Sequence, residues 1–287
     1  MRFGCYERHH RSKQRQRHHN SFNYSIAFPL SSLLPALAGR GAVPAMRIFV
    51  LSGQSNMAGR GGVHHRRWDG VVPPEGAPDP GIQRHSASLD WEEAREPLHA
   101  DIDTTKTCGV GPGMVFARAV LPSLQEDNPG EGALAGIGLV PCAVGGTAIR
   151  EWARGEHLYE QMVSRARVAA QYGEIEAVLW YQGESDAESH ASAAAYLGNI
   201  ERLIANVRED LGMPQLPFIQ VALASGDKRN IDEVRNAQFS VNLPDVVTVD
   251  AMGLALNEDN MHLTTESQVK LGKMLAEAYI KNFLTTC

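Results

Sequence analysis

The chain has 287 residues, 43% of them hydrophobic and 21% charged, as is usual for a globular protein with one large or two small α/β domains. This composition excludes collagen-like, coiled-coil and disulfide-scaffold proteins, and the four scattered cysteines lack the spacing of a metal or redox site. The net charge of −6 includes a basic start, since residues 1–46 hold seven Lys or Arg and one acid. The remainder is therefore strongly acidic, which argues against a nucleic-acid partner.

The first 45 residues differ in character from the rest of the chain. An Arg/His-rich run over 9–19 precedes a stretch of Ser, Leu, Pro and Ala. We expect a basic, disordered extension over 1–45 and one domain over 46–287. The extension resembles an organelle transit peptide; alternatively, Met46 is the working start. We favour the cytoplasm as the location, with organelle import as the alternative. The apolar stretch 26–38 is too short to span a membrane, so no transmembrane segment is expected.

After the extension, apolar runs of strand length alternate with amphipathic helical stretches. Strands are expected at 47–52, 137–144, 177–182, 218–224 and 246–251. Helices are expected at 113–124, 157–172, 191–211 and 234–242, followed by a last helix that opens with a capping box from Thr265 to Gln268. Several strands are almost continuously apolar, as in a parallel sheet covered on both faces. The fold class predicted is α/β: a three-layer α/β/α sandwich with a mainly five-stranded parallel sheet.

Residues 60–111 resist this assignment. They are rich in Gly, Pro and charge and show no clear hydrophobic period. A segment of this length without regular structure is either functional or poorly ordered. We favour an insertion that flanks the substrate and carries aromatic residues, with Trp68 and Trp91 in this segment.

A serine follows the first expected strand at its carboxyl end, in the segment Gly53-Gln-Ser-Asn56. Active sites of parallel sheets lie at this edge. Ser55 is therefore a candidate nucleophile, with backbone N–H groups and the positive end of a helix dipole beside it. The alternative is an ordinary helix N-cap serine. The Gly-x-Ser-x-Gly elbow of α/β-hydrolases is absent.

A carboxylate and an imidazole lie three residues apart before the last helix, at Asp259 and His262. A serine hydroxyl needs a neutral imidazole to take its proton, and the imidazole needs an acceptor on its other nitrogen. His262 is the candidate base and Asp259 its orienting acceptor, with Glu258 as a rival. Donors for an oxyanion are expected from the glycine pair Gly145–Gly146 and from the Gln182 amide, each after a strand.

Together, Gly53-Gln-Ser-Asn56, Gly145-Gly-Thr147, Trp180-Tyr-Gln-Gly-Glu-Ser-Asp186 and Asp259-x-x-His262 resemble the SGNH (GDSL-like) hydrolase superfamily. More narrowly, they resemble its plant carbohydrate-esterase branch, related to sialate O-acetylesterases and family 6 acetylxylan esterases. The resemblance covers roughly residues 46–283. It implies a flavodoxin-like sheet and hydrolysis of O-acetyl groups on sugars without a cofactor or metal.

The same resemblance assigns site residues. Ser55, His262 and Asp259 would form the triad, and the oxyanion hole would comprise the Ser55 N–H, one of Gly145 and Gly146, and Gln182. Gln182 replaces the asparagine of most superfamily members, as is usual in this branch. Candidate substrate contacts are Gln54, Arg150, Trp152 and Glu184, although core packing is an equal alternative for Trp152.

Other functions remain open from the sequence. Glu184 and Asp186 suggest a glycosidase pair, but two residues of one segment do not easily flank a sugar. A sugar-binding protein of the same fold without catalysis is a second possibility, and a lipid or thioester substrate is a third. The sequence leaves the sugar, the acetylated position and the oligomeric state undetermined.

Overall fold

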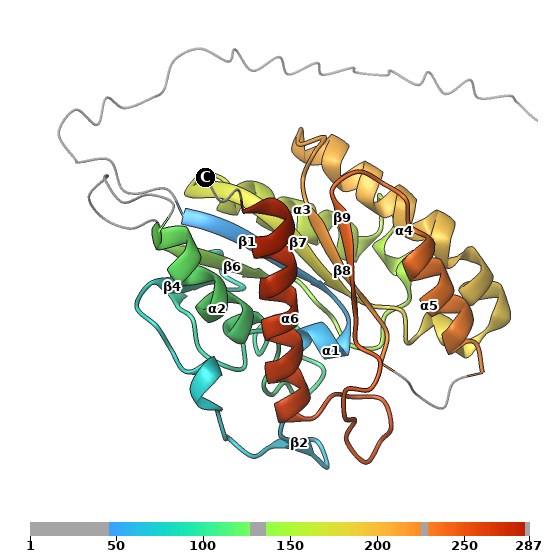
Figure 1. The fold of residues 1–287 in the computed structure, drawn as a ribbon, viewed down its shortest axis with the longest axis horizontal. Helices are drawn as coiled ribbons and strands as arrows, with labels where there is room; N and C mark the ends of the chain where they lie inside the picture. Colours follow the sequence, from blue (N-terminus) through green and yellow to red (C-terminus); the bar gives the residue numbers. More distant parts are fainter. Residues whose placement is uncertain (1–45, 127–135, 225–228, 285–287) are drawn as a thin grey trace, which may run out of the picture. The chain divides into compact units, whose positions relative to one another are not determined.

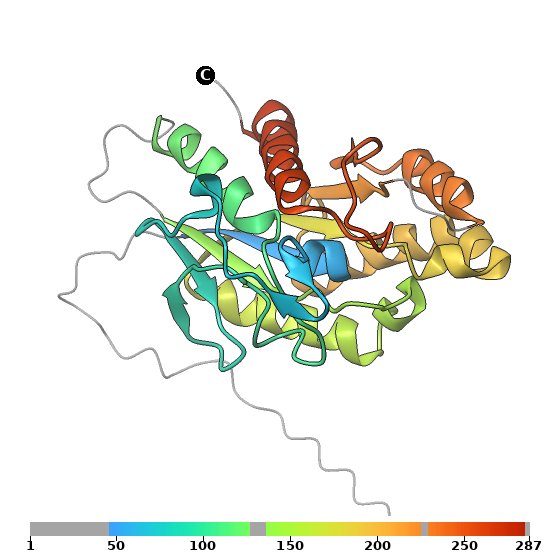
Figure 2. The same cartoon turned by 90° about the horizontal axis from the view of Figure 1, so that it is seen from below.

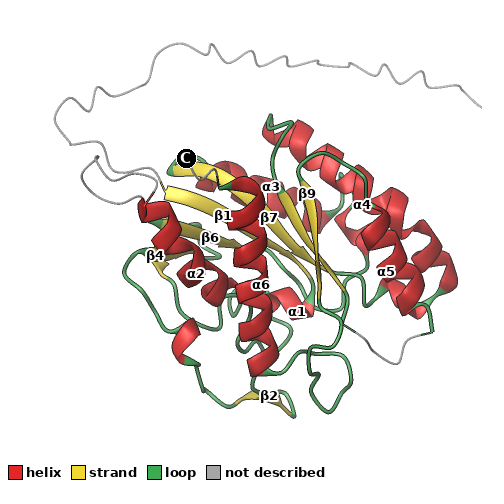
Figure 3. Cartoon of the chain, viewed as in Figure 1, coloured by secondary structure: helices red, strands yellow, loops and turns green. Residues whose placement is uncertain are grey.

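The central feature of the fold is a sheet of seven strands between two layers of helices (Figures 1 and 3). The computed structural model describes residues 46–126, 136–224 and 229–284, so the predicted extension at 1–45 lies outside the described residues. The strands are β1 (Met46–Gly53), β4 (Ile82–His85), β5 (Trp91–Glu93), β6 (Ile137–Pro141), β7 (Gly173–Tyr181), β8 (Phe218–Ala222) and β9 (Val246–Asp250). They lie in the order β5-β4-β6-β1-β7-β8-β9.

The sheet is parallel except for the edge strand β5. All neighbouring strands pair in parallel apart from β4 and β5, which are antiparallel. The five strands predicted from the sequence form the continuous block β6-β1-β7-β8-β9. Within it, β6 and β8 are buried at every residue, as expected for strands covered on both faces.

Five long helices cover the sheet: α2 (Gly113–Glu126), α3 (His157–Ala169), α4 (His190–Leu211), α5 (Ile231–Ser240) and α6 (Thr265–Phe283). Helices α2 and α6 pack together on one face, and α3 and α4 cover the other, with α5 packed on α4 (Figure 2). This arrangement confirms the predicted α/β/α class. The apolar stripe of α4 is buried, and Gly212 ends the helix with a left-handed φ of 68°.

Two strands within 60–111 were missed, the edge strand β5 and its neighbour β4. Both are short and largely polar in sequence, and the buried Arg84 in β4 is paired with carboxylates. The Arg84 guanidinium in β4 bonds the carboxylates of Asp101, at 2.6 and 2.8 Å, and of Glu92, at 2.7 Å. The segment also carries the two-residue strands β2 (Val63–His64) and β3 (Arg67–Trp68) and the 3₁₀ helix η1 (Pro74–Gly76).

The cap of α6 was predicted one residue too late. Thr264 is the N-cap, and its hydroxyl accepts the Ser267 N–H at 3.2 Å. Gln268 does not close a capping box with Thr265. Its side-chain amide instead donates to the Asn56 carbonyl at 3.1 Å, because Gln268 is buried against the segment that follows β1.

Candidate active site

Ser55 lies at the carboxyl end of β1, as the first residue of the single-turn helix α1 (Ser55–Ala58). Gln54 holds the N-cap position, so the N-cap interpretation of Ser55 is wrong. The expected helix dipole is also reduced, since four residues give only one turn. Helix α1 does supply backbone N–H groups that have no partner within the helix, as the first turn of any helix does.

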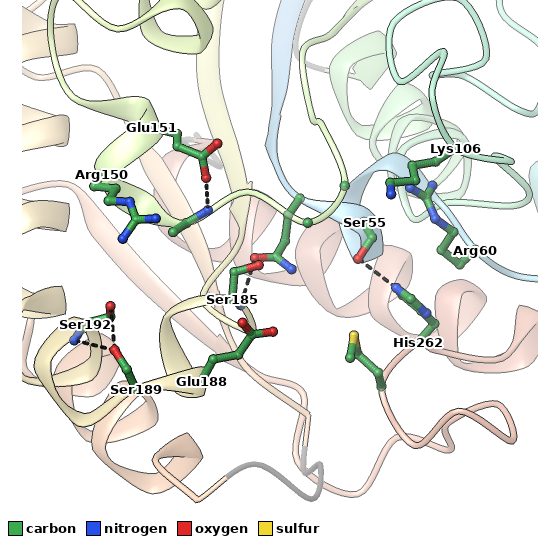
Figure 4. A pocket seen from close by; sticks show the side chains of 15 residues that line it. Ser55, Arg60, Lys106, Arg150, Glu151, Ser185, Glu188, Ser189, Ser192 and His262 are labelled. Carbon is green, nitrogen blue, oxygen red and sulfur yellow. Dashed lines mark hydrogen bonds between the residues drawn. The ribbon is translucent and has the colours of Figure 1, made fainter.

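His262 reaches Ser55 from the loop between β9 and α6. Its Nε2 lies 2.8 Å from the Ser55 hydroxyl, although the two residues are 207 positions apart (Figure 4). On the other side of the ring, Nδ1 lies 2.6 Å from Asp259 Oδ2. The rival carboxylate, Glu258, is exposed, and Asp259 occupies the position beside the ring. The structure thus brings the three predicted groups into one hydrogen-bonded line.

The Asp259 carboxylate is held ionised. Partial burial raises the pKa of this carboxyl, but hydrogen bonds from the His262 N–H, the imidazole and the Met261 N–H outweigh that effect, and the net shift is downward. The two backbone donors both bind Oδ1, at 2.9 Å for His262 and 3.0 Å for Met261. This leaves Oδ2 for the ring and fixes the carboxylate plane against it.

A pocket of about 500 Å³ opens over Ser55 and His262 (Figure 4). Its lining is polar: hydroxyls, backbone of the glycine pair and both signs of charge, with Met261 and Ala148 as the apolar members. The fifteen lining residues are Gln54, Ser55, Arg60, Lys106, Gly145, Gly146, Ala148, Arg150, Glu151, Ser185, Glu188, Ser189, Ser192, Met261 and His262. None of these fifteen is Phe, Tyr or Trp, so segment 60–111 lines the pocket with Arg60 and Lys106 and not with the aromatic residues expected of it.

The glycine pair borders the pocket, and its two N–H groups differ. The Gly145 N–H donates to Asp103 Oδ2 at 3.1 Å. That carboxylate also forms a buried ion pair with Arg60. Gly146 has a left-handed φ of 79° and is exposed, and within the described chain no hydrogen bond engages its N–H. The N–H that remains available to a ligand is therefore that of Gly146.

Gln182 is not positioned to donate to a ligand. It is completely buried and does not line the pocket. Its side-chain nitrogen faces three acceptors: Asp186 Oδ2 at 2.6 Å, the Thr147 carbonyl at 2.9 Å and Gln54 Oε1 at 3.2 Å. Two hydrogens cannot serve these three acceptors and a ligand as well. The expectation of a direct oxyanion donor at this position does not fit the geometry.

Gln54 offers the amide that Gln182 cannot. Its Oε1 accepts from Gln182 and from the N–H groups of Gly183, at 3.3 Å, and Ser185, at 3.4 Å. These three donors fix the orientation of the Gln54 amide through its oxygen, and its Nε2 is not engaged by them. Gln54 lines the pocket beside Ser55. The sequence suggested Gln54 only as a substrate contact, because the distribution of amide hydrogens between two glutamines is visible only in three dimensions.

The other suggested substrate contacts separate into rim and core. Arg150 is exposed and lines the pocket. Trp152 is fully buried, packs edge-on against Trp180 at 5.3 Å and donates to the Thr147 hydroxyl at 3.1 Å, so the core alternative applies. Glu184 is buried and accepts from the Asn56 side chain at 2.7 Å. Since Asp186 is also buried and neither carboxylate lines the pocket, a glycosidase pair is not formed.

Two cationic lining residues, Arg60 and Lys106, were missed. Both lie within segment 60–111, which shows no hydrophobic period and no motif that would indicate a role for them. Within the described ranges no three His, Cys, Asp or Glu side chains cluster as metal ligands would. None of the helices in those ranges is both long and apolar enough to cross a membrane.

Comparisons with known proteins agree on one family. A family model described as carbohydrate esterase, sialic acid-specific acetylesterase (SASA), matches residues 45–281. The chain is 58% identical over 248 residues to a protein of Arabidopsis thaliana named probable carbohydrate esterase At4g34215, covering 84% of this chain and 93% of the relative. The X-ray structure of that protein matches with a TM-score of 0.78 and 57% identity over 84% of this chain and 100% of the other. The structure of NanS matches in fold, with a TM-score of 0.66 at 19% identity over 83% and 97% of the two chains.

Proposed function

Because this chain belongs to the SASA family of carbohydrate esterases, we propose that it removes O-acetyl groups from sugars with Ser55 as nucleophile, His262 as base and Asp259 as orienting carboxylate. The observation that carries the proposal is the line from Ser55 Oγ to His262 Nε2, at 2.8 Å, and from Nδ1 to Asp259, at 2.6 Å. This line opens directly into a pocket. A hydroxyl, a ring and a carboxylate in this order are what acyl transfer by serine requires.

The reaction proceeds in two halves. Ser55 Oγ attacks the acetyl carbonyl carbon while His262 Nε2 takes the hydroxyl proton. The tetrahedral intermediate then collapses, and the imidazolium returns the proton to the sugar oxygen as that oxygen leaves. Water attacks the acetyl-enzyme in the second half and gives one proton to His262. The second tetrahedral intermediate then collapses, the imidazolium returns that proton to Ser55 Oγ, and acetic acid leaves and ionises to acetate. Asp259 stabilises the imidazolium in both halves.

Three donors are available for the oxyanion. They are the N–H groups of Ser55 and Gly146, neither of which has a hydrogen-bond partner among the described residues, and the side-chain amide of Gln54. Donors of this kind stabilise the charge that develops on the carbonyl oxygen in the transition state. In this arrangement Gln182 orients Gln54 and does not itself touch the substrate.

The pocket favours a small acyl group on a polar alcohol. Hydroxyls of Ser185, Ser189 and Ser192 and the charged rim of Arg150 and Glu151 suit a hydroxyl-rich leaving group. An acyl chain of lipid length would have to bury itself against these polar groups at a cost. This argues for an acetylated sugar over a lipid ester.

Labelling and hydrolysis test the proposal together. A serine-directed phosphonate is expected to modify Ser55, with mass spectrometry of the digested protein locating the adduct. Acetate release is expected from acetylated sugars and acetylated xylan. Among p-nitrophenyl esters of increasing chain length, the rate is expected to be highest for the acetyl ester. Absence of an adduct and of acetate release would instead favour a sugar-binding protein.

Gln54→Ala is expected to lower kcat by about 10²–10³-fold, since one prealigned oxyanion donor has typically that effect. Binding of the substrate in its ground state is expected to change little, because the donor acts on charge that is present only in the transition state. Steady-state kinetics on p-nitrophenyl acetate measure the change, and Gln220→Met is the control. Gln220 is likewise a buried amide with two accepting partners, but it lies in β8 and does not line the pocket. A wild-type kcat for Gln54→Ala would mean that backbone N–H groups alone hold the oxyanion.

A further inference from the structure

The residue after the candidate nucleophile joins the two halves of the site. Asn56 is the second residue of α1 and is completely buried, outside the pocket lining. We propose that Asn56 is a positioning residue that fixes the backbone on both sides of His262 and so sets the distance between His262 and Ser55. The inference rests on the proposed esterase function.

The contacts of the Asn56 amide are placed on either side of the base. Its Nδ2 donates to the Met261 carbonyl at 3.1 Å, and its Oδ1 accepts the Leu263 N–H at 2.9 Å. These two residues are the chain neighbours of His262. The Asn56 side chain, which is adjacent to Ser55 in the chain, therefore binds the segment 261–263 on both sides of the imidazole-bearing residue.

Asn56 is held by two further hydrogen bonds, one at its side-chain amide and one at its backbone carbonyl. Its second Nδ2 hydrogen goes to Glu184 Oε1 at 2.7 Å, which fixes the orientation of the amide. The Asn56 carbonyl accepts the Gln268 side chain at 3.1 Å, which ties α1 to α6, beside which it lies (Figure 1). Glu184, suggested from the sequence as a substrate contact, thus has a place in the support of the site.

Asp259 cannot perform this task. It lies in the same loop as His262, so its bond to the ring orients the imidazole within the loop and moves with it. The position of the loop relative to β1 needs a contact between the two segments, and the Asn56 amide provides two. A misplacement of about 1 Å at a reacting group can cost about 10²-fold in rate.

Asn56→Ala is expected to lower kcat about 10²-fold on p-nitrophenyl acetate with KM unchanged, because Asn56 holds the chain neighbours of the base and does not line the pocket. The decisive measurement adds the same substitution to His262→Ala. A residue that acts through the imidazole has nothing left to position there, so the residual kcat of the double variant is expected to equal that of His262→Ala. An equal further loss in both backgrounds, or a wild-type kcat for Asn56→Ala, overturns the proposal.

Two other variants keep the experiment interpretable. If the cavity left by Asn56→Ala unfolds the chain, Asn56→Ser takes its place in the experiment. The serine leaves a hydroxyl and room for water near the vacated backbone groups, and the same loss of kcat is expected. Gln220→Met, which also removes a buried amide, is expected to lower the melting temperature while leaving kcat unchanged. If Ser55→Ala keeps full turnover, the proposed function fails; if only the Asn56 variants do, the inference alone fails.

Discussion

Ser55→Ala is expected to lower kcat for acetyl-ester hydrolysis by about 10⁴–10⁶-fold, the largest effect of any single substitution in this chain. Without Oγ no acetyl-enzyme forms, and only the oxyanion donors and substrate binding contribute to the residual rate. The hydroxyl interacts with His262 and not with the core, so the melting temperature is expected to stay near that of the wild type. Acetate release at saturating substrate measures the loss.

The His262→Ala variant provides the matching comparison. Because Ser55 and His262 act as one unit, the double variant is expected to be no slower than the worse single variant. Multiplicative losses would show that the two groups work independently, and turnover retained by folded Ser55→Ala would remove Ser55 from the nucleophile role.

Asp259→Asn is expected to lower kcat by about 10⁴-fold, and by more than Asp259→Ala. The reason is the fixed orientation of this side chain. Oδ1 receives the N–H groups of Met261 and His262, so the asparagine oxygen is expected to take that place and turn its NH₂ toward Nδ1 of the ring. The ring then must carry its proton on Nε2, which is the tautomer that cannot accept a proton from Ser55.

The pair of Asp259 variants separates this explanation from simple loss of a charge. Kinetics of both on p-nitrophenyl acetate, with melting temperatures as a check on folding, give the comparison. If alanine is the more damaging change, the charge of Asp259 matters more than the tautomer it selects.

The sequence predicts the five strands of the block β6-β1-β7-β8-β9 because they are visible as mostly apolar runs, as in β6 and β8. It fails at β4, where Arg84 is buried by carboxylates that come from other parts of the chain. Hydrophobic periodicity carries no trace of such pairs. The cap of α6 was misplaced for a related reason, since Thr264 and Thr265 both suit a cap and tertiary contacts of Gln268 decide between them.

The site shows the same division. Ser55, His262 and Asp259 were found from residue type and position after strands, and they lie within hydrogen-bonding distance of one another. The donor role assigned to Gln182 fails because three acceptors already compete for its two hydrogens. Spacing in a sequence indicates which side chains reach an edge of the sheet, but not how they divide their hydrogen bonds.

The polar walls around Ser55 have a consequence for selectivity. Among the described lining residues there is no Phe, Tyr or Trp on which a pyranose could stack, so affinity depends largely on matched hydroxyl contacts, each worth only about 0.5–1.5 kcal/mol. Such a site discriminates by the pattern of donors and acceptors, and a deoxy or epimeric sugar that leaves one wall group unmatched is rejected more strongly than one of slightly different size. The stereochemistry of the sugar, more than its size, would then define which acetyl esters this enzyme accepts.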